Sequence, residues 1–178
     1  MAEQAATLVI FAHPVLERAR VAPGLLAAAE GIDGIEIRDL YELYPDFTID
    51  VEAEQAALTR HQRIVLQFPF FWYSAPALLK EWLDLVLTHG WAYGEAGLAL
   101  KGKVMACAIS TGGGRTAYQT KGHNRFTIAE FLRPFDQTAH LCNMRWGKPF
   151  VVHGAAVLTE ADLKREAERY ADYLKGPL

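Results

Sequence analysis

A series of short, nearly continuous apolar runs constrains the fold of this 178-residue chain more than any other feature. Four runs are strong, at residues 7–12, 64–68, 104–109 and 150–152. Apolar side chains on consecutive positions are typical of parallel strands, because such strands are covered on both faces. A weaker run at residues 35–38 alternates apolar with charged residues, which is typical of a more exposed strand.

Helical patterns lie between these runs. Pro76 suits the first turn of a helix, and apolar residues follow at helical spacing: Leu79, Trp82, Leu83 and Val86. Residues 159–174 begin with a capping motif and carry one apolar stripe, and two further helices are expected at residues 18–30 and 126–135. Strand and helix therefore alternate about five times, which predicts a doubly wound α/β layer with a parallel sheet.

Composition limits the possible partners and the cellular setting. The net charge is −3 without a basic tract, which argues against nucleic acid as the main partner. Cys107 and Cys142 form no CxxC pair, which favours a reducing compartment, and a metal site built on His140 and Cys142 has weak support. Met1 to Ala6 lack a signal-peptide pattern, and no apolar run reaches membrane-spanning length. We expect one domain over residues 1–178, in the cytoplasm, with docking at the inner face of the membrane left open.

Ligands of open parallel sheets bind beyond the carboxyl ends of the strands, so the loops there are informative. The loop after the first run lacks the glycine patterns of a Rossmann site or a P-loop. It carries His13, Arg18 and Arg20 beside an expected helix start, a combination that can hold a phosphate. The alternative is that the two arginines are solvated surface residues.

The loop after the third strand contains four consecutive aromatic residues, Phe70, Phe71, Trp72 and Tyr73. Four neighbouring aromatic side chains cannot all point into one core, so some must be exposed or line a cavity. A planar ring ligand is a reasonable guest for such a turn. The alternative is that some of these rings pack in the core and the rest form a dimer interface.

The loop after the fourth strand contains Thr111 and a run of glycines, Gly112, Gly113 and Gly114. Glycines let the backbone approach a ligand closely and offer amide N–H groups that stabilise negative charge on a bound ring. Tyr118 and His123 follow in the same loop and are candidate proton donors. Each feature alone also fits an ordinary turn, and the prediction rests on their occurrence together.

The chain resembles the NAD(P)H dehydrogenase (quinone) family of flavodoxin-like proteins, and within it the ancillary proteins of glutathione-regulated potassium-efflux systems. The resemblance covers almost the whole chain and is carried by five segments: residues 13–14, 39–47, 72–80, 89–94 and 110–114. It implies a flavodoxin-like three-layer sandwich with a five-stranded parallel sheet. It also implies a bound flavin, FMN with FAD as the alternative, and a homodimer with active sites at the subunit interface.

The resemblance further implies roles for individual residues. His13 and the residues through Arg20 would surround the flavin phosphate, and Phe70 through Tyr73 would border the isoalloxazine ring. Thr111 through Gly114 would offer amides to the ring, and Tyr118 and His123 would assist hydride transfer. The family usually has a serine near Ala19 and often an asparagine near Ala22, so the phosphate site here lacks two polar side chains.

The implied reaction has two halves in one pocket. NAD(P)H passes a hydride to the flavin and leaves, and a quinone then accepts two electrons, which predicts ping-pong kinetics. The principal alternative is a regulatory subunit of a potassium/proton antiporter with incidental or no reductase activity. A serine hydrolase is not supported, because Ser74 and Ser110 are the only serines and neither lies in a G-x-S-x-G motif.

Overall fold

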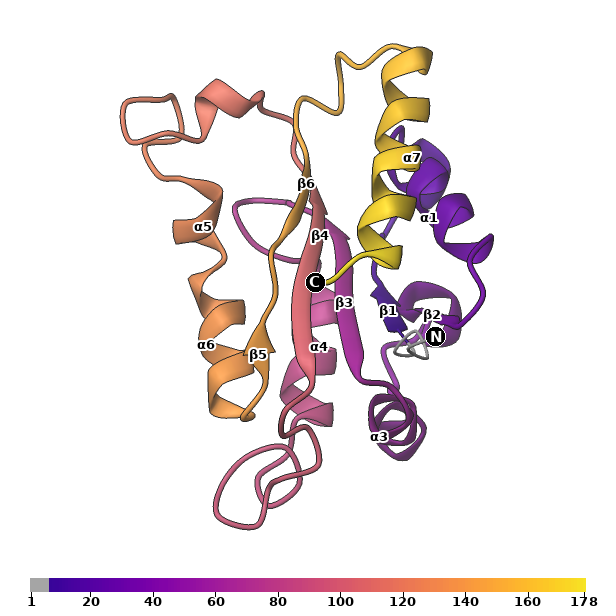
Figure 1. Cartoon of the computed structure of the whole chain (residues 1–178), viewed down its shortest axis with the longest axis vertical. Coiled ribbons are helices and arrows are strands. Elements are labelled where there is room, and N and C mark those ends of the chain that lie inside the picture. The colour runs from indigo at the N-terminus through magenta and orange to yellow at the C-terminus, as the bar shows by residue number, and fades with distance from the viewer. Residues whose placement is uncertain (1–6) are drawn as a thin grey trace.

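The computed structural model describes residues 7–178, so the N-terminal residues considered above for a signal sequence lie outside the described residues. The strands are β1 (Thr7–Phe11), β2 (Ile35–Asp39), β3 (Arg63–Pro69), β4 (Val104–Ser110), β5 (Arg145–Trp146) and β6 (Phe150–Val152). The α-helices are α1 (Ala22–Glu30), α2 (Leu40–Leu43), α3 (Val51–Arg60), α4 (Ala77–Val86), α5 (Ile128–Phe131), α6 (Arg133–Leu141) and α7 (Glu160–Lys175). Figure 1 shows the sheet in the middle with helices on both sides.

All strand pairs are parallel, in the order β2-β1-β3-β4-β5, and β6 also pairs with β4. The predicted parallel sheet is confirmed, but its last position is shared by two short strands. β5 pairs with the start of β4 and β6 with its end, and Gly147-Lys148-Pro149 separates them. Because proline has no N–H for the ladder, the sheet pairing is interrupted there, and the prediction of one strand at residues 150–152 was incomplete.

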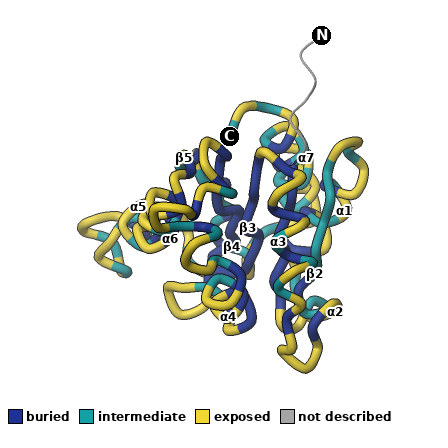
Figure 2. Tube along the Cα trace, turned by 90° about the horizontal axis from the view of Figure 1, so that it is seen from below, coloured by how far each residue is buried: buried dark blue, intermediate teal, exposed yellow. Residues whose placement is uncertain are grey.

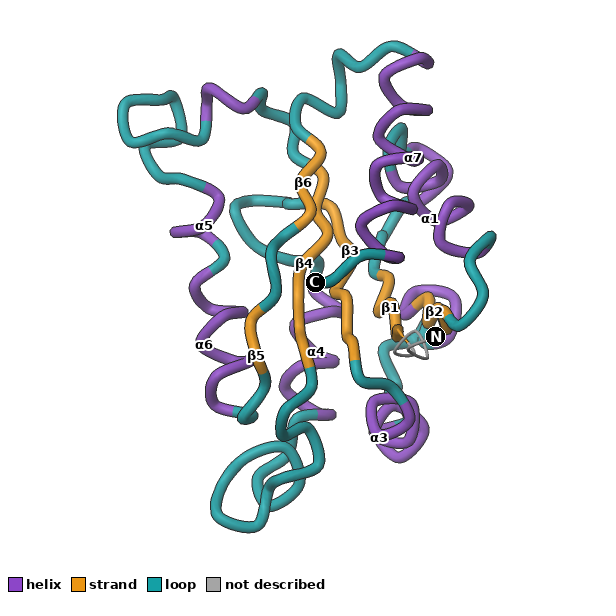
Figure 3. The backbone as a smooth tube through the Cα atoms, viewed as in Figure 1, coloured by secondary structure: helices purple, strands orange, loops and turns teal. Residues whose placement is uncertain are grey.

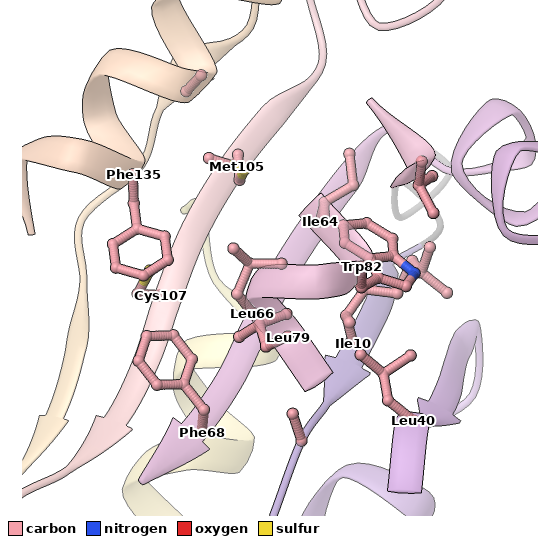
Figure 4. Packing of buried hydrophobic residues seen from close by; sticks show 14 of the residues in the cluster. Ile10, Leu40, Ile64, Leu66, Phe68, Leu79, Trp82, Met105, Cys107 and Phe135 are labelled. Atoms are coloured by element: carbon pink, nitrogen blue, oxygen red, sulfur yellow. The ribbon is translucent and has the colours of Figure 1, made fainter. Parts of the chain in front are cut away.

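The two faces of the sheet have separate cores. Ile10, Leu66 and Cys107 point toward the face covered by α3, α4 and α6, where Trp82 and Phe135 complete the packing (Figure 4). The opposite face packs against α1 and α7, with these buried residues among its members: Val9, Phe11, Val65, Phe150 and Tyr170. Figure 2 shows the buried strands enclosed by half-exposed helices. Burial on both faces explains why the strands are nearly continuous apolar runs.

Several helices differ from the predicted ranges. The helix expected at residues 18–30 begins at Ala22, after a short 3₁₀ helix at Leu16–Arg18. The helix expected at 126–135 is two helices, α5 and α6, and α6 continues to Leu141. Helix α3 was not predicted. Helices α4 and α7 agree with the predicted ranges to within about a residue.

The segment from Asp39 to Phe47, one of the segments that carry the family resemblance, has a structural role. The Asp39 side chain accepts hydrogen bonds from two backbone N–H groups at the start of α2. Tyr44 donates a 2.5 Å hydrogen bond to the buried carboxylate of Glu54, which also binds Arg38 and accepts from the Trp82 indole. One buried carboxylate on α3 therefore joins β2, the residue that follows α2, and α4.

Candidate active site

Two adjoining cavities lie at the carboxyl ends of the strands. The first has a volume of about 370 Å³ and the second about 330 Å³, and Phe70 and Gly112 line both. The first is walled by these residues: His13, Val15, Arg18, Ala19, Arg20, Val21, Ala22, Pro69, Phe70, Phe71, Ser110, Thr111, Gly112, Ala155 and Ala156. The second is walled by Phe70, Trp72, Tyr73, Gly112, Gly113, Ala117, Tyr118, His123 and Asn124. Twelve of the thirteen predicted site residues line one or both cavities, and Gly114 lines neither.

The sheet topology explains this position. The chain moves outward from β1 to β2 and then returns to β3 on the other side of β1. Loops that leave β1 and β3 therefore diverge and open a crevice at the carboxyl edge, which is where ligands of such sheets bind. Figure 3 shows the loop after β4 at the same end of the sheet, opposite the long loop between α4 and β4.

His13 lies at the start of the loop after β1 and is nearly buried. Its Nδ1 accepts a 3.2 Å hydrogen bond from the Val15 backbone, so the proton of the neutral ring is on Nε2. Its ring lies edge-on to Phe71, with 6.0 Å between centroids. Burial lowers the pKa of His13, partly opposed by the charge of Glu17, so the ring offers a neutral N–H donor at neutral pH.

The two arginines of this loop have different surroundings. Arg20 donates hydrogen bonds of 2.8 Å to the Ala156 carbonyl and 2.6 Å to the Leu158 carbonyl. Arg18 is exposed and lines the first cavity, and its guanidinium forms no hydrogen bond or salt bridge with the described residues, although its backbone N–H donates to the Val15 carbonyl. Arg18 is therefore the cation with its donors available to a ligand, while Arg20 also holds the cavity wall together.

The N-terminus of α1 opens onto the first cavity. Val21 and Ala22 line it, and no side chain caps the helix. Pro23 in the first turn has no N–H, so the remaining uncapped amides at this end, together with a nearby cation, form an anion-binding site. Ala19 and Ala22 belong to the same wall and have no polar side chain, so an anion there would be bound chiefly by backbone amides and Arg18.

The aromatic loop forms a tight turn. Phe70 is 7% exposed, whereas Phe71, Trp72 and Tyr73 are 47%, 93% and 46% exposed, which confirms that the four rings do not share one core. Trp72 and Tyr73 both have left-handed backbones, with φ of 49° and 64°, and Phe71 pairs with Ser74 across the turn. Two consecutive aromatic residues in this region are strained, and such strain is often found at ligand sites.

The glycine loop borders both cavities. A side chain at Gly113 would meet the Tyr118 ring at 3.2 Å, so the close approach there favours glycine. The N–H of Gly112 has no hydrogen-bond partner within residues 7–178 and is available to a ligand. Gly114 instead precedes a short 3₁₀ helix at Arg115–Ala117.

The two predicted proton donors lie in the wall of the second cavity. Tyr118 is 9% exposed and packs against Phe70 and Phe131. Burial raises the pKa of its hydroxyl, an effect partly offset by hydrogen bonding with Thr111, Gly113 and Asn124. Tyr118 is therefore a neutral hydrogen-bond donor at neutral pH. His123 is exposed on the rim of the same cavity.

The loop after β6 also reaches the site and was missed by the sequence analysis. Ala155 and Ala156 line the first cavity, and His153 Nδ1 lies 3.3 Å from Thr111 Oγ1. The Thr111 hydroxyl donates to the Gly113 carbonyl, so it accepts from His153. The available signal was the position of the loop, because it follows a parallel strand as the other three do.

The segment at residues 89–94 does not lie at these cavities. It belongs to the loop between α4 and β4, at the opposite end of the sheet (Figure 3). In the described part of the chain, no helix is long and apolar enough to span a membrane. The same residues contain no group of three or more His, Cys, Asp or Glu side chains suited to a metal ion.

Comparison with known proteins identifies the family. A model of the flavodoxin-like fold matches residues 5–174 of the chain. The chain belongs to this flavodoxin-like family. An uncharacterised NAD(P)H oxidoreductase of Bacillus subtilis is 48% identical over 96% of this chain and 98% of its own length. A glutathione-regulated potassium-efflux system ancillary protein of Klebsiella aerogenes is 43% identical over 94% of this chain and 93% of its own.

Solved structures of this flavodoxin-like family superpose closely. General stress protein 14 of Treponema denticola, in complex with FMN, gives a TM-score of 0.89 at 41% identity, covering 94% of this chain and 97% of its own. An NADPH-quinone reductase of P. pentosaceus gives 0.86 at 37%, covering 94% and 96%. A structure named as a thermophilic tryptophan halogenase, from Streptomycin violaceusniger, gives 0.94 at 42%, covering 96% and 99%.

Proposed function

We propose that this protein is an FMN-dependent NAD(P)H:quinone oxidoreductase that transfers two electrons by a ping-pong mechanism. The observation that carries the proposal is the pair of adjoining cavities at the β1/β3 switch point. One cavity combines an uncapped helix N-terminus with a cation, and the other is bordered by aromatic side chains and an N–H group without a partner. This polarity matches a molecule with a phosphate at one end and a planar ring at the other.

The residues present fit FMN. Its phosphate suits the first-turn amides of α1 and the Arg18 guanidinium, which supply charge-assisted hydrogen bonds. Its ring suits the region around Phe70 and Gly112, the two residues common to both cavities. A similar protein, the general stress protein of T. denticola, was solved in complex with FMN, which supports FMN over FAD.

The names of similar proteins support the reaction class. One relative is named an NAD(P)H oxidoreductase and a similar structure an NADPH-quinone reductase, at 48% and 37% identity. The bound flavin supplies hydride acceptance and donation, while the protein supplies orientation and electrostatics. The protein's own contribution is what its side chains and amides do around that group.

Individual residues would have separate tasks. The Gly112 N–H would stabilise negative charge at the edge of the ring, because a fixed donor in a partly buried site needs no reorganisation. Tyr118 would donate a hydrogen bond from a hydroxyl that stays protonated at neutral pH. His123, on the rim, would exchange protons with solvent. Phe70 would pack against the ring, and the strained turn would present Trp72 to the open side.

One open cavity beside the ring accounts for alternating substrates. The second cavity is the one bordered by the proton donors, so the nicotinamide and the quinone would occupy it in turn. Ping-pong kinetics follow from that exclusion.

The first test is reconstitution with flavin. The purified protein is mixed with FMN or FAD, excess is removed by gel filtration, and the visible spectrum is recorded. The proposal predicts that FMN is retained and that initial rates at several quinone concentrations give parallel double-reciprocal lines. Retention of neither flavin contradicts the proposal.

A second candidate function is an ancillary subunit of a potassium-efflux antiporter. The 43% identity to such a protein over most of both chains favours it, and it is compatible with reductase activity. Potassium efflux from vesicles containing a purified antiporter, with and without this protein, tests it. Efflux that is unchanged by the protein contradicts the second candidate but leaves the first untouched.

We also propose that the protein is a homodimer whose active sites lie at the subunit interface. The exposed rings of Phe71, Trp72 and Tyr73 support an apolar contact at this edge. Light scattering after size-exclusion chromatography should give twice the chain mass, and a monomer mass at micromolar concentration would contradict a stable dimer.

A further inference from the structure

Residues 112–126 concentrate positive charge in a chain whose net charge is −3. Arg115, Lys121 and Arg125 lie in this loop together with His123, and no aspartate or glutamate occurs between residues 112 and 129. The next acidic residue, Glu130, accepts hydrogen bonds from Thr127 at the start of α5. The positive charge of this loop, which we call the basic loop, is therefore not balanced within it.

The cations of the basic loop also form no salt bridges with described residues outside the loop. Arg115, Lys121 and Arg125 are exposed, and none forms a salt bridge with any residue from 7 to 178. Six other arginine and lysine side chains of the described residues do form salt bridges: Arg20, Arg38, Arg60, Lys80, Arg165 and Arg169. The Arg125 guanidinium lies 5.9 Å from the centroid of the neighbouring Phe126 ring, a contact that does not neutralise its charge. Because no acidic side chain among the described residues pairs with these cations, their charge can act on a ligand.

The basic loop has a defined fold against the second cavity. The Asn124 N–H donates to the Ala117 carbonyl at 2.9 Å, and the Tyr73 hydroxyl donates to the Asn124 side chain at 3.3 Å. A side chain at Gly122 would come within 2.4 Å of the Thr116 carbonyl, so the loop closes tightly on itself. His123 and Asn124 line the cavity immediately before Arg125 in the chain, and Gly113 and Ala117 line it on either side of Arg115. The cations of the basic loop therefore adjoin residues of the cavity wall.

Neither FMN nor a quinone explains these cations. The FMN phosphate has its own anion site at Arg18 and the start of α1, in the first cavity. A quinone has no charge to match. The remaining anionic reactant of the proposed reaction is the nicotinamide dinucleotide, which must reach the second cavity to meet the ring.

We infer that the basic loop binds the 2′-phosphate of NADPH through Arg115 and Arg125, and that the protein therefore prefers NADPH to NADH. This inference rests on the proposed oxidoreductase function. A phosphate monoester carries a charge of about −1.5 to −2 at neutral pH, and the planar guanidinium binds such a group with two parallel hydrogen bonds. The pyrophosphate is common to both nucleotides, so NADPH and NADH form a matched pair that isolates the 2′-phosphate.

The kinetic test compares kcat/KM for the two nucleotides in the FMN-loaded protein. We expect the wild type to favour NADPH by about tenfold or more at low ionic strength, and added salt to reduce that ratio. Arg115→Ala and Arg125→Ala should each lower the NADPH value by about fivefold and leave the NADH value within about twofold. Arg145→Ala is the matched control, because Arg145 is exposed beside Val104 at the far end of the sheet and its side chain forms no salt bridge with residues 7–178.

A binding test separates this inference from the proposed function. Calorimetry measures the affinity of the protein for adenosine 2′,5′-bisphosphate and for 5′-AMP, and needs no turnover. We expect the bisphosphate to bind more tightly, and the double variant Arg115→Ala/Arg125→Ala to lose that difference. Equal kcat/KM for NADPH and NADH in the wild type overturns the inference alone. Preferential bisphosphate binding without flavin reduction by either nucleotide supports the phosphate subsite and contradicts the oxidoreductase function.

Discussion

The Arg20 guanidinium donates a 2.6 Å hydrogen bond to the carbonyl oxygen of Leu158, 138 residues further along the chain. This contact joins the loop after β1 to the loop after β6, and both loops wall the first cavity. The donors of Arg20 are directed at backbone carbonyls rather than at a ligand. Arg20 therefore shapes the proposed phosphate site, whereas Arg18 has no such contacts and is free to bind the phosphate.

Substitution of these two arginines should distinguish the structural role of Arg20 in the cavity wall from the role of the Arg18 charge in binding FMN. Arg20→Lys keeps the positive charge but loses the planar guanidinium that donates to several backbone carbonyls. It should therefore raise the Kd for FMN by about tenfold and lower the Tm of the flavin-free protein. Arg18→Ala should raise the Kd, reduce its salt dependence, and leave the Tm unchanged. Flavin fluorescence quenching measures the Kd. An Arg20→Lys protein with wild-type Kd and Tm would refute the structural role of Arg20.

Tyr118→Phe removes the hydroxyl and keeps the ring that packs against Phe70. We expect kcat with NADPH and a quinone to fall by about a hundredfold, because a positioned proton donor contributes on that scale. The Kd for FMN should change by less than about threefold. Tyr173→Phe is the control, since the Tyr173 hydroxyl donates to the Lys148 carbonyl away from the cavities. Equal rates for both variants would exclude Tyr118 as the proton donor.

Glu54→Gln removes a buried carboxylate that binds Arg38, Tyr44 and Trp82. The substitution leaves the half-buried Arg38 guanidinium with only the more distant Glu36 carboxylate, 3.8 Å away, so the free energy of unfolding should fall by about 3 kcal/mol. Tyr44→Phe removes one neutral donor to the same carboxylate and should cost about 1 kcal/mol. Urea denaturation measures both. A Glu54→Gln protein no less stable than Tyr44→Phe would show that the carboxylate contributes little as a charge.

The stability of the protein should depend on the protonation of His153. Burial lowers the pKa of His153, and the charges of Arg115 and Arg169 lower it further against the opposing effect of Glu166. Below about pH 6.5 the unfolded chain binds a proton that the folded protein resists, so stability falls as the pH falls through this range. His153→Asn should reduce the slope of Tm against pH between about 5 and 7. An unchanged slope would show that another group causes the pH dependence of stability. His13 is the next candidate, because burial also lowers its pKa.

The sheet was predictable because strands that are buried on both faces have nearly continuous apolar sequences. Helix α3 was not, because its buried positions are Glu54, Ala57 and Leu58, which do not form an apolar stripe. β5 was missed because two residues beside Gly147 and Pro149 give no strand signal. In both cases tertiary contacts, rather than local preference, determine the structure.

The parts of the candidate site that carry charged, aromatic or otherwise distinctive side chains were predictable from the sequence. Cationic, aromatic and glycine-rich loops at three strand ends identified most of the cavity walls. The fourth loop was missed because Ala155 and Ala156 carry no functional group, and the contact of Ala156 with Arg20 is made by a backbone carbonyl. The charge of the basic loop could be read from the sequence, but its position on the rim of the second cavity required the fold.

The most direct measurement of the central claim is an anaerobic titration of the FMN-loaded protein followed by its visible spectrum. Equimolar NADPH should bleach the flavin band completely, and an equimolar benzoquinone added afterwards should restore it, because the two half-reactions occur separately in one site. A band that NADPH and NADH both leave unchanged, or that a quinone fails to restore, would contradict the assignment of this protein as a quinone oxidoreductase.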